Sequence, residues 1–166
     1  MLPISVVVPA FNAEASVQRA LKSIAAQKSM PTEVALVDDG SSDRTYELAN
    51  SMQGEFGATN LTVLRQSNQG AGAARNLALR HSEQEWIAFL DADDEWLPDK
   101  LTNCWHHISR GKTTFLAHNG WISDAGAETY IDINSHESRT HAETYIEEAA
   151  GVYIGAEHDL HLRHHS

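Results

Sequence analysis

The sequence predicts an α/β fold, with helices on both faces of a mostly parallel central sheet. Four short apolar runs alternate with segments of helical period between residues 4 and 108 of the 166-residue chain. The connections between them are short, which favours right-handed crossovers and parallel neighbouring strands. The length and a hydrophobic content of 42% fit one ordinary globular domain.

Each expected element has a local cause in the sequence. The strands are apolar runs bounded by proline, glycine or acidic turn residues, at residues 4–8, 33–37, 61–64 and 86–90. Helices are expected after them, at about residues 17–27, 43–52, 70–81 and 98–110. Asn12 or Ser16 is available to cap the first helix and Asp43 to cap the second.

The pattern weakens after residue 110. Short strands are expected at residues 115–117 and 120–122, a hairpin turn at 123–126 and a helix at 140–150. Nine of the ten histidines lie between His106 and His165. Without a cysteine pair or a His-Glu-x-x-His pattern, they do not predict a zinc site.

Each of the four strands ends in a segment with polar or ligand-binding chemistry: residues 9–12, 38–39, 68–76 and 91–94. In a parallel sheet these segments lie along one edge, and ligands of open α/β sheets bind at that edge. The sequence therefore predicts a site at the carboxyl ends of the strands.

Asp91, Asp93 and Asp94 crowd into one short segment directly after the fourth apolar run. Like charges this close repel one another, and a cation relieves the repulsion. Carboxylate oxygens suit Mg²⁺ or Mn²⁺, which commonly bridge a protein carboxylate to substrate phosphates. The alternative is a solvated acidic turn.

The other strand ends each allow two interpretations. Asp38 and Asp39 either accept hydrogen bonds from a base or ribose, or serve only as turn residues. Phe11 either stacks on a base or belongs to the core. The segment 70–76 either brings Arg75 close to phosphates or packs its small residues tightly on the sheet. It is neither a P-loop nor a dinucleotide fingerprint.

Composition excludes some classes of function. The net charge of −11 argues against a nucleic-acid surface, which needs a basic stripe. The single cysteine, Cys104, excludes an internal disulfide and fits a reducing compartment. The start has no basic region typical of a signal peptide, and no run reaches about 18 apolar residues, the length of a spanning helix. We therefore expect a cytoplasmic protein without a transmembrane segment.

Taken together, the polar segments and their spacing resemble the family 2 glycosyltransferases. The matching segments are residues 4–12, 37–43, 68–76, 89–94 and 96–101. The resemblance covers residues 2–105 and implies a three-layer α/β/α GT-A fold for nucleotide-diphospho-sugars, here shortened at the C-terminus. Residues 1–105 are then the donor-binding half, and 106–166 a short acceptor-side half of the same domain.

The resemblance also implies roles for individual residues. The nucleotide-sugar-binding set is Pro9, Phe11, Asn12, Asp38, Asp39, Asn68, Gly70, Arg75, Asp91 and Asp93. Within it, Asp39 contacts the base and Arg75 lies near the diphosphate. Asp91 and Asp93 contact the ribose and a divalent cation, Mn²⁺ or Mg²⁺, with Asp94 as an additional ligand.

Family members are typically inverting, so one carboxylate deprotonates the acceptor hydroxyl and no covalent intermediate is needed. Aligning residues 159–163 with the family's Asp-Leu-x-Leu-Arg-like segment places Glu157 at the base position. Ala156 stands where a preceding glutamate is usual. The alternative is that Glu157 is an ordinary surface acid.

The sequence thus predicts a metal-dependent glycosyltransferase of surface polysaccharide or glycoconjugate synthesis. Its expected partners are a nucleotide-diphospho-sugar, with UDP the first guess, and a sugar or glycolipid acceptor, met in the cytoplasm or at the inner face of the membrane. The alternative is a catalytically incomplete nucleotide-sugar-binding remnant or a fragment of a larger glycosyltransferase. A sugar-1-phosphate nucleotidyltransferase is disfavoured, because residues 9–14 lack that class's glycine-rich loop.

Overall fold

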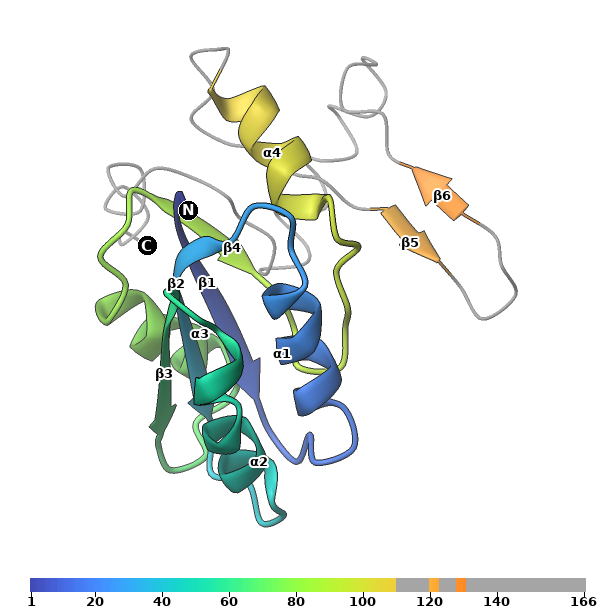
Figure 1. Cartoon of the computed structure of the whole chain (residues 1–166). Coiled ribbons are helices and arrows are strands. Elements are labelled where there is room, and N and C mark those ends of the chain that lie inside the picture. The colour runs from blue at the N-terminus through green and yellow to red at the C-terminus, as the bar shows by residue number, and fades with distance from the viewer. Residues whose placement is uncertain (110–119, 123–127, 131–166) are drawn as a thin grey trace, which may run out of the picture.

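The computed structural model describes residues 1–109, 120–122 and 128–130 (Figure 1). Its elements are β1 (Leu2–Ala10), α1 (Val17–Ala25), β2 (Pro31–Asp38), α2 (Thr45–Ser51), the 3₁₀ turn η1 (Gln53–Glu55), β3 (Asn60–Arg65), α3 (Ala71–Arg80), β4 (Trp86–Phe89), α4 (Lys100–Ile108), β5 (Gly120–Ile122) and β6 (Glu128–Tyr130). The predicted strand at 115–117, turn at 123–126 and helix at 140–150 lie outside the described residues, as does Glu157.

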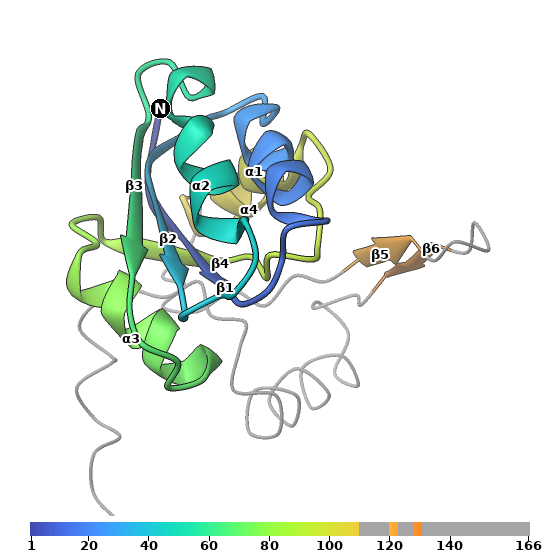
Figure 2. The same cartoon turned by 90° about the horizontal axis from the view of Figure 1, so that it is seen from below.

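The central sheet has four parallel strands in the order β3-β2-β1-β4. The predicted α/β fold with a parallel sheet is confirmed. β1 lies in the middle, where Val6 is in register with Val34 of β2 and Ala88 of β4. Because all four strands run the same way, their carboxyl ends meet at one edge, which Figure 2 shows from below.

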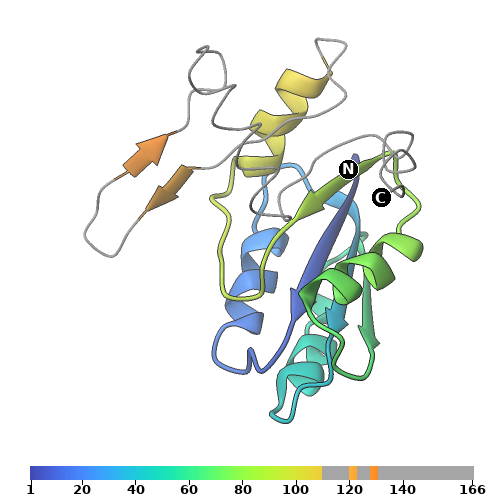
Figure 3. The same cartoon turned by 180° about the vertical axis from the view of Figure 1, so that it is seen from behind.

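Helices cover both faces of this sheet. Alternate residues of β1 point to opposite faces: Val6 and Val8 belong to a core cluster with α1, α2 and α4, and Val7 belongs to a second cluster with α3. Ala74 and Ala78 of α3 are fully buried against the second face. Figures 1 and 3 show α3 on one side of the sheet and α1 on the other. The predicted three layers are therefore confirmed.

The observed elements differ from the predicted ones mainly at their ends. β1 and β2 extend beyond the apolar runs because they pair with each other up to Ala10 and Asp38. Ser16 takes the N-cap position of α1, but its side chain makes no capping hydrogen bond. At α2 the N-cap is Arg44, one residue after the predicted Asp43.

The structure also contains a small two-stranded antiparallel sheet, formed by β5 and β6. β5 covers the predicted strand at residues 120–122. Within the described part of the chain, no helix has the combination of length and apolar character that crossing a membrane requires.

Candidate active site

A pocket of about 310 Å³ opens at the carboxyl edge of the sheet. Small-molecule sites usually enclose about 300–1,000 Å³. The pocket is lined by Pro9, Ala10, Phe11, Asn12, Ala13, Ser16, Asp39, Ala71, Arg75, Asp91, Ala92 and Asp93. Seven of these were predicted from the sequence: Pro9, Phe11, Asn12, Asp39, Arg75, Asp91 and Asp93. Four other predicted residues do not line it: Asp38, Asn68, Gly70 and Asp94.

The loop after β1 forms one wall of the pocket. Phe11 leaves 51% of its surface exposed, so the interpretation as a core residue is wrong. Asn12 has a φ of +48°, a left-handed conformation that asparagine tolerates better than most residues. An aromatic ring exposed at the mouth of a pocket is available to stack on a flat ligand.

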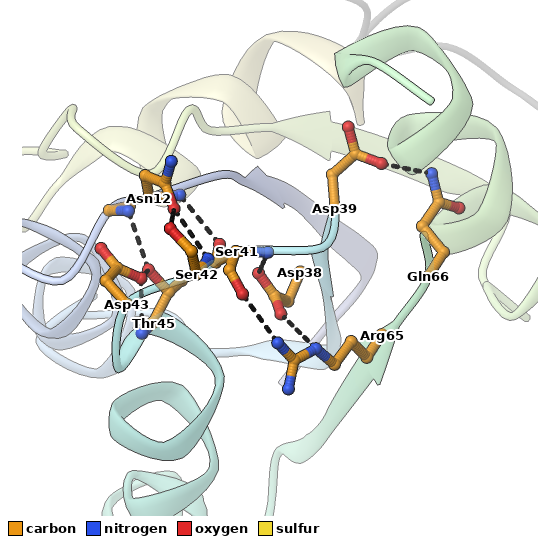
Figure 4. Close-up of polar contacts among 10 residues, drawn as sticks. Asn12, Asp38, Asp39, Ser41, Ser42, Asp43, Thr45, Arg65 and Gln66 are labelled. Carbon is orange, nitrogen blue, oxygen red and sulfur yellow. Dashed lines mark hydrogen bonds and ion pairs between the residues drawn. The ribbon is translucent and has the colours of Figure 1, made fainter. Parts of the chain in front are cut away.

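A second loop, after β2, holds the first one in place (Figure 4). The backbone N–H of Asn12 donates to Ser41 Oγ at 2.8 Å, and Asn12 Oδ1 accepts from the Ser42 N–H at 2.9 Å. The Ala13 N–H donates to Thr45 Oγ1 at 2.8 Å. These bonds satisfy backbone groups at the turn and fix the wall that carries Phe11.

Asp43 strengthens the same connection. Its Oδ2 accepts from the Glu14 N–H at 3.1 Å, and its Oδ1 accepts from the Thr45 N–H at 3.0 Å. Burial raises the pKa of Asp43, but the hydrogen bonds from Thr45 and Glu14 outweigh it and hold the pKa below its usual value. The carboxylate is therefore stabilised in its charged form.

Asp38 points away from the pocket and is completely buried. Its Oδ1 accepts from the Ser41 N–H at 3.1 Å, and its Oδ2 lies 3.0 Å from Arg65 Nε (Figure 4). The second contact is an ion pair without hydrogen-bond geometry, because Oδ2 has no hydrogen-bond partner in the described structure. Arg65 also donates to the Ser41 carbonyl at 2.7 Å. All these contacts are within the protein, so Asp38 supports the loop after β2.

Asp39 faces the opposite way and lines the pocket, although it is only 2% exposed. Its Oδ1 accepts from Gln66 Nε2 at 2.7 Å and from the Gln69 N–H at 2.9 Å, and its Oδ2 accepts from the Gly70 N–H at 2.7 Å. Burial raises the pKa of Asp39, but these three hydrogen bonds lower it by more, so the group stays ionised. A carboxylate offers about four lone pairs, which leaves acceptor capacity for a ligand.

Gly40 allows the loops after β2 and β3 to approach closely. Its φ is +75°, and a Cβ atom here would lie 2.7 Å from the backbone N of Asn68. Only glycine fits both conditions without a shift. Asn68 and Gly70 therefore belong to the loop that Gly40 and Asp39 hold, rather than to the lining of the pocket.

Arg75, from α3, brings a positive charge to a pocket whose other charged lining residues are three aspartates. Its Nη2 lies 2.7 Å from Asp91 Oδ1. The Arg75 side chain is 18% exposed and that of Asp91 is 49% exposed, so the ion pair sits at the pocket wall with Arg75 deeper. Arg75 Nε is buried without a hydrogen-bond partner among the described residues, so the guanidinium is not fully satisfied.

The loop after β4 forms the acidic wall. Asp91 and Asp93 line the pocket, and the Asp94 N–H closes a turn onto the Asp91 carbonyl at 3.0 Å. Burial and the neighbouring charges of Asp93 and Asp91 raise the pKa of Asp94, while Arg19 opposes the rise. The acidic residues therefore do repel one another, as the sequence indicates.

The three carboxylates do not form a metal centre by themselves. Among the described residues, no group of three or more His, Cys, Asp or Glu side chains is arranged to hold an ion. The pocket presents two of the predicted ligands, Asp91 and Asp93. Mg²⁺ is usually held by one or two carboxylates together with substrate phosphates and water, so this set fits a cation that enters with a phosphorylated ligand.

The family comparison agrees with this geometry. The family described as glycosyl transferase family 2 matches residues 5–156. The chain belongs to this family. Among its curated relatives is the succinoglycan biosynthesis protein ExoW of Rhizobium meliloti, 34% identical over 135 residues. That match covers 78% of this chain and 40% of ExoW, so this chain spans less than half of the length of that relative.

Two solved structures share the GT-A glycosyltransferase fold. S. aureus TarS 1-349 in complex with UDP is 27% identical with a TM-score of 0.70, over 81% of this chain and 40% of TarS. The mannosyltransferase PcManGT from Pyrobaculum calidifontis, in complex with GDP-Man and Mn²⁺, is 26% identical with a TM-score of 0.66. The match covers 74% of this chain and 36% of PcManGT. The predicted family and the predicted fold class are both confirmed.

Sequence reasoning missed two sets of residues. Ala10, Ala13, Ser16, Ala71 and Ala92 also line the pocket. They lie within a few positions of predicted residues, so proximity in the chain was their only signal. Ser41, Thr45 and Gln66 fix the loops through side chains that resemble ordinary turn residues, and no sequence signal separates them from surface polar positions.

Proposed function

We propose that this chain is a metal-dependent, inverting glycosyltransferase that takes a sugar from a nucleotide-diphospho-sugar. One observation carries the proposal: an exposed aromatic ring, a guanidinium and two exposed carboxylates meet in one pocket at the carboxyl edge of the sheet, as Phe11, Arg75, Asp91 and Asp93. The aromatic ring can stack on a base, the guanidinium can bind a diphosphate, and the carboxylates can bind a cation.

The donor is proposed to lie along the pocket from Phe11 to Arg75. Phe11 stacks on the base, Asp39 accepts a hydrogen bond from a base N–H with its remaining lone pair, and Arg75 contacts the diphosphate. The complexes of TarS with UDP and of PcManGT with GDP-Man support a nucleoside diphosphate as the shared part of the donor. UDP is the first nucleotide to test.

Asp91 and Asp93 are proposed to hold Mn²⁺ or Mg²⁺ together with the diphosphate. When bound, such a cation offsets the charge that develops on the leaving diphosphate. Arg75 adds a second positive charge on the same wall. The Mn²⁺ in the PcManGT complex supports this cofactor.

Acceptor activation is proposed to come from the second half of the chain, residues 106–166, with Glu157 as the base. The acceptor is a sugar or a glycolipid, in surface polysaccharide or glycoconjugate synthesis. The reaction is proposed to take place in the cytoplasm or at the inner face of the membrane. Glu157 lies one residue beyond the segment that matches the family.

A thermal-shift screen tests the donor proposal. UDP, GDP, CDP and dTDP are each added with and without Mn²⁺, because a ligand that binds only the folded state raises the apparent stability. We expect one nucleotide to raise the melting temperature, and to raise it further with Mn²⁺. No shift with any of the four would contradict the proposed function.

A further inference from the structure

Two polar residues of α1, and a third just past its end, lie along the segment that follows the acidic wall. Arg19, Ser23 and Gln27 are four residues apart, a spacing that places them on one face of a helix. Each of them contacts the segment 93–97, between β4 and α4. Figures 1 and 3 show this segment running along α1.

Ser23 and Gln27 make these contacts from buried positions. Ser23 is 8% exposed and its Oγ accepts from the Trp96 N–H at 3.1 Å. Gln27 is 4% exposed, donates to the Leu97 carbonyl at 2.7 Å and accepts from the Leu101 N–H at 2.9 Å. Leaving a buried backbone group without a hydrogen-bond partner destabilises the folded protein by about 1–3 kcal/mol. These bonds therefore strongly favour one backbone conformation of the segment.

Arg19 continues the row to the pocket itself. Its Nη2 donates to the carbonyl of Asp93 at 3.0 Å, and its Nε pairs with Glu95 at 2.7 Å. Both side chains of the pair are about half exposed, so the pair itself adds little to folding stability. The contact with Asp93 nevertheless ties α1 to the residue that lines the acidic wall.

The same helix also joins the opposite wall. Ser16, at the N-cap of α1, is one of the pocket-lining residues, as is Asn12. Building on the proposed function, we propose that Arg19, Ser23 and Gln27 are positioning residues. They set the separation between the Phe11–Ser16 wall and Asp93, and so the space for a cation bound to a diphosphate.

A purely structural role for these hydrogen bonds is the competing explanation. Thr59 offers a matched comparison, because its side chain is 5% exposed and donates one hydrogen bond to the Pro31 carbonyl at 2.7 Å. It lies at the amino ends of β2 and β3, opposite the pocket. Ser23→Ala and Thr59→Val therefore each remove one buried side-chain hydroxyl. The Ser23 hydroxyl contacts the segment that carries Asp93, whereas the Thr59 hydroxyl contacts Pro31.

The test is calorimetric titration of UDP, with and without Mn²⁺, into the whole 166-residue wild-type chain, Ser23→Ala and Thr59→Val. Loss of a group that orients a metal ligand directly lowers affinity about 10–100-fold, and for the indirect Ser23 we expect about threefold or more. This loss should appear only with Mn²⁺, leaving metal-free UDP binding and Thr59→Val unchanged. Gln27→Met should show the same selective loss.

Two results would overturn the inference. In one, Ser23→Ala and Thr59→Val behave alike; in the other, Ser23→Ala weakens UDP equally with and without Mn²⁺. If the wild type binds UDP but Mn²⁺ adds nothing, the metal part of the proposed function fails, and the inference fails with it. If the wild type binds none of UDP, GDP, CDP and dTDP, the donor proposal itself is wrong.

Discussion

Arg75 Nη2 and Asp91 Oδ1 lie 2.7 Å apart and join α3 to the loop after β4. The pair connects two of the pocket's walls and neutralises one of its carboxylates. A diphosphate that reaches Arg75 competes with Asp91 for the same guanidinium, while a cation at Asp91 competes with Arg75 for the carboxylate. The two ligands are therefore expected to help each other, because each releases the partner that the other needs.

Replacing Arg75 by methionine tests its role toward phosphate. We expect UDP binding to weaken about tenfold or more, since a charge-assisted bond to a phosphate is worth about 1.5–3 kcal/mol. Uridine binding should stay within about twofold of the wild type, because uridine carries no phosphate. Titration of both ligands measures the difference, and an equal loss for uridine and UDP would show that Arg75 only supports the fold.

Asp39→Asn tests the carboxylate that holds the loop after β3. In the wild type, N–H donors bind both carboxylate oxygens of Asp39. An asparagine amide has only one acceptor oxygen, so we expect a loss of about 1–3 kcal/mol in the free energy of unfolding at pH 7. The control Asp99→Asn removes only an exposed pair with Lys28 and should change stability by about 0–1 kcal/mol. Urea unfolding measures both, and equal losses would contradict the role of Asp39.

The same variant predicts a pH dependence. The folded pKa of Asp39 lies below its ordinary value of 3.8, so its stabilisation is fully present above that pH and is lost as the pH falls through the folded pKa. The stability difference between the wild type and Asp39→Asn should therefore shrink below pH 3.8. A difference that stays constant from pH 7 to pH 3 would rule out the ionised carboxylate as its source.

Gly40→Ala and Gly57→Ala separate backbone strain from close approach. Both glycines have a positive φ, of +75° and +58°, but only at Gly40 would a Cβ meet a backbone atom, Asn68 N at 2.7 Å. We expect Gly57→Ala to cost about 1–2 kcal/mol, as left-handed backbone does, and Gly40→Ala to cost more. Gly40→Ala should also weaken UDP binding, because it displaces the loop that Asp39 holds. Equal melting temperatures for the two variants would contradict this account of Gly40.

Glu157→Gln tests the proposed base. We expect transfer of the sugar to fall by about 100-fold or more, the scale of general base catalysis, while UDP binding stays unchanged. Product formation and UDP titration are measured on the same preparation. Normal turnover in the variant would remove Glu157 from the mechanism, and no transfer by the wild type with any donor would favour a binding remnant.

Much of the fold followed from the sequence because its causes are local. The strand at residues 4–8 is an apolar run, and the parallel order then brings residues from four distant segments to one edge. Asp91 and Asp93 line the pocket because they directly follow β4, which ends at that edge. Periodicity and the topology of parallel sheets are sufficient for this part.

The remaining features depend on contacts between segments. Asp38 and Asp39 look equivalent in the sequence, but the side chains of consecutive residues in an extended chain face opposite ways. Asp38 therefore forms an ion pair with Arg65 of β3, away from the pocket. Ser23 and Gln27 bind backbone groups of a distant segment, so no pattern of side chains there reveals them. Asp94 illustrates the same limit, because the turn that closes on Asp91 leaves it out of the pocket lining.

Titration of UDP in the presence of Mn²⁺ into wild type, Asp93→Asn and Asp94→Asn tests the central claim most directly. Asp93 lines the pocket and Asp94 does not, although they are neighbours of equal charge. We predict that Asp93→Asn weakens binding at least about tenfold, or about 1.4 kcal/mol, and that Asp94→Asn changes it by less than about twofold. Unchanged affinity in Asp93→Asn would contradict a donor site built on this wall of the pocket.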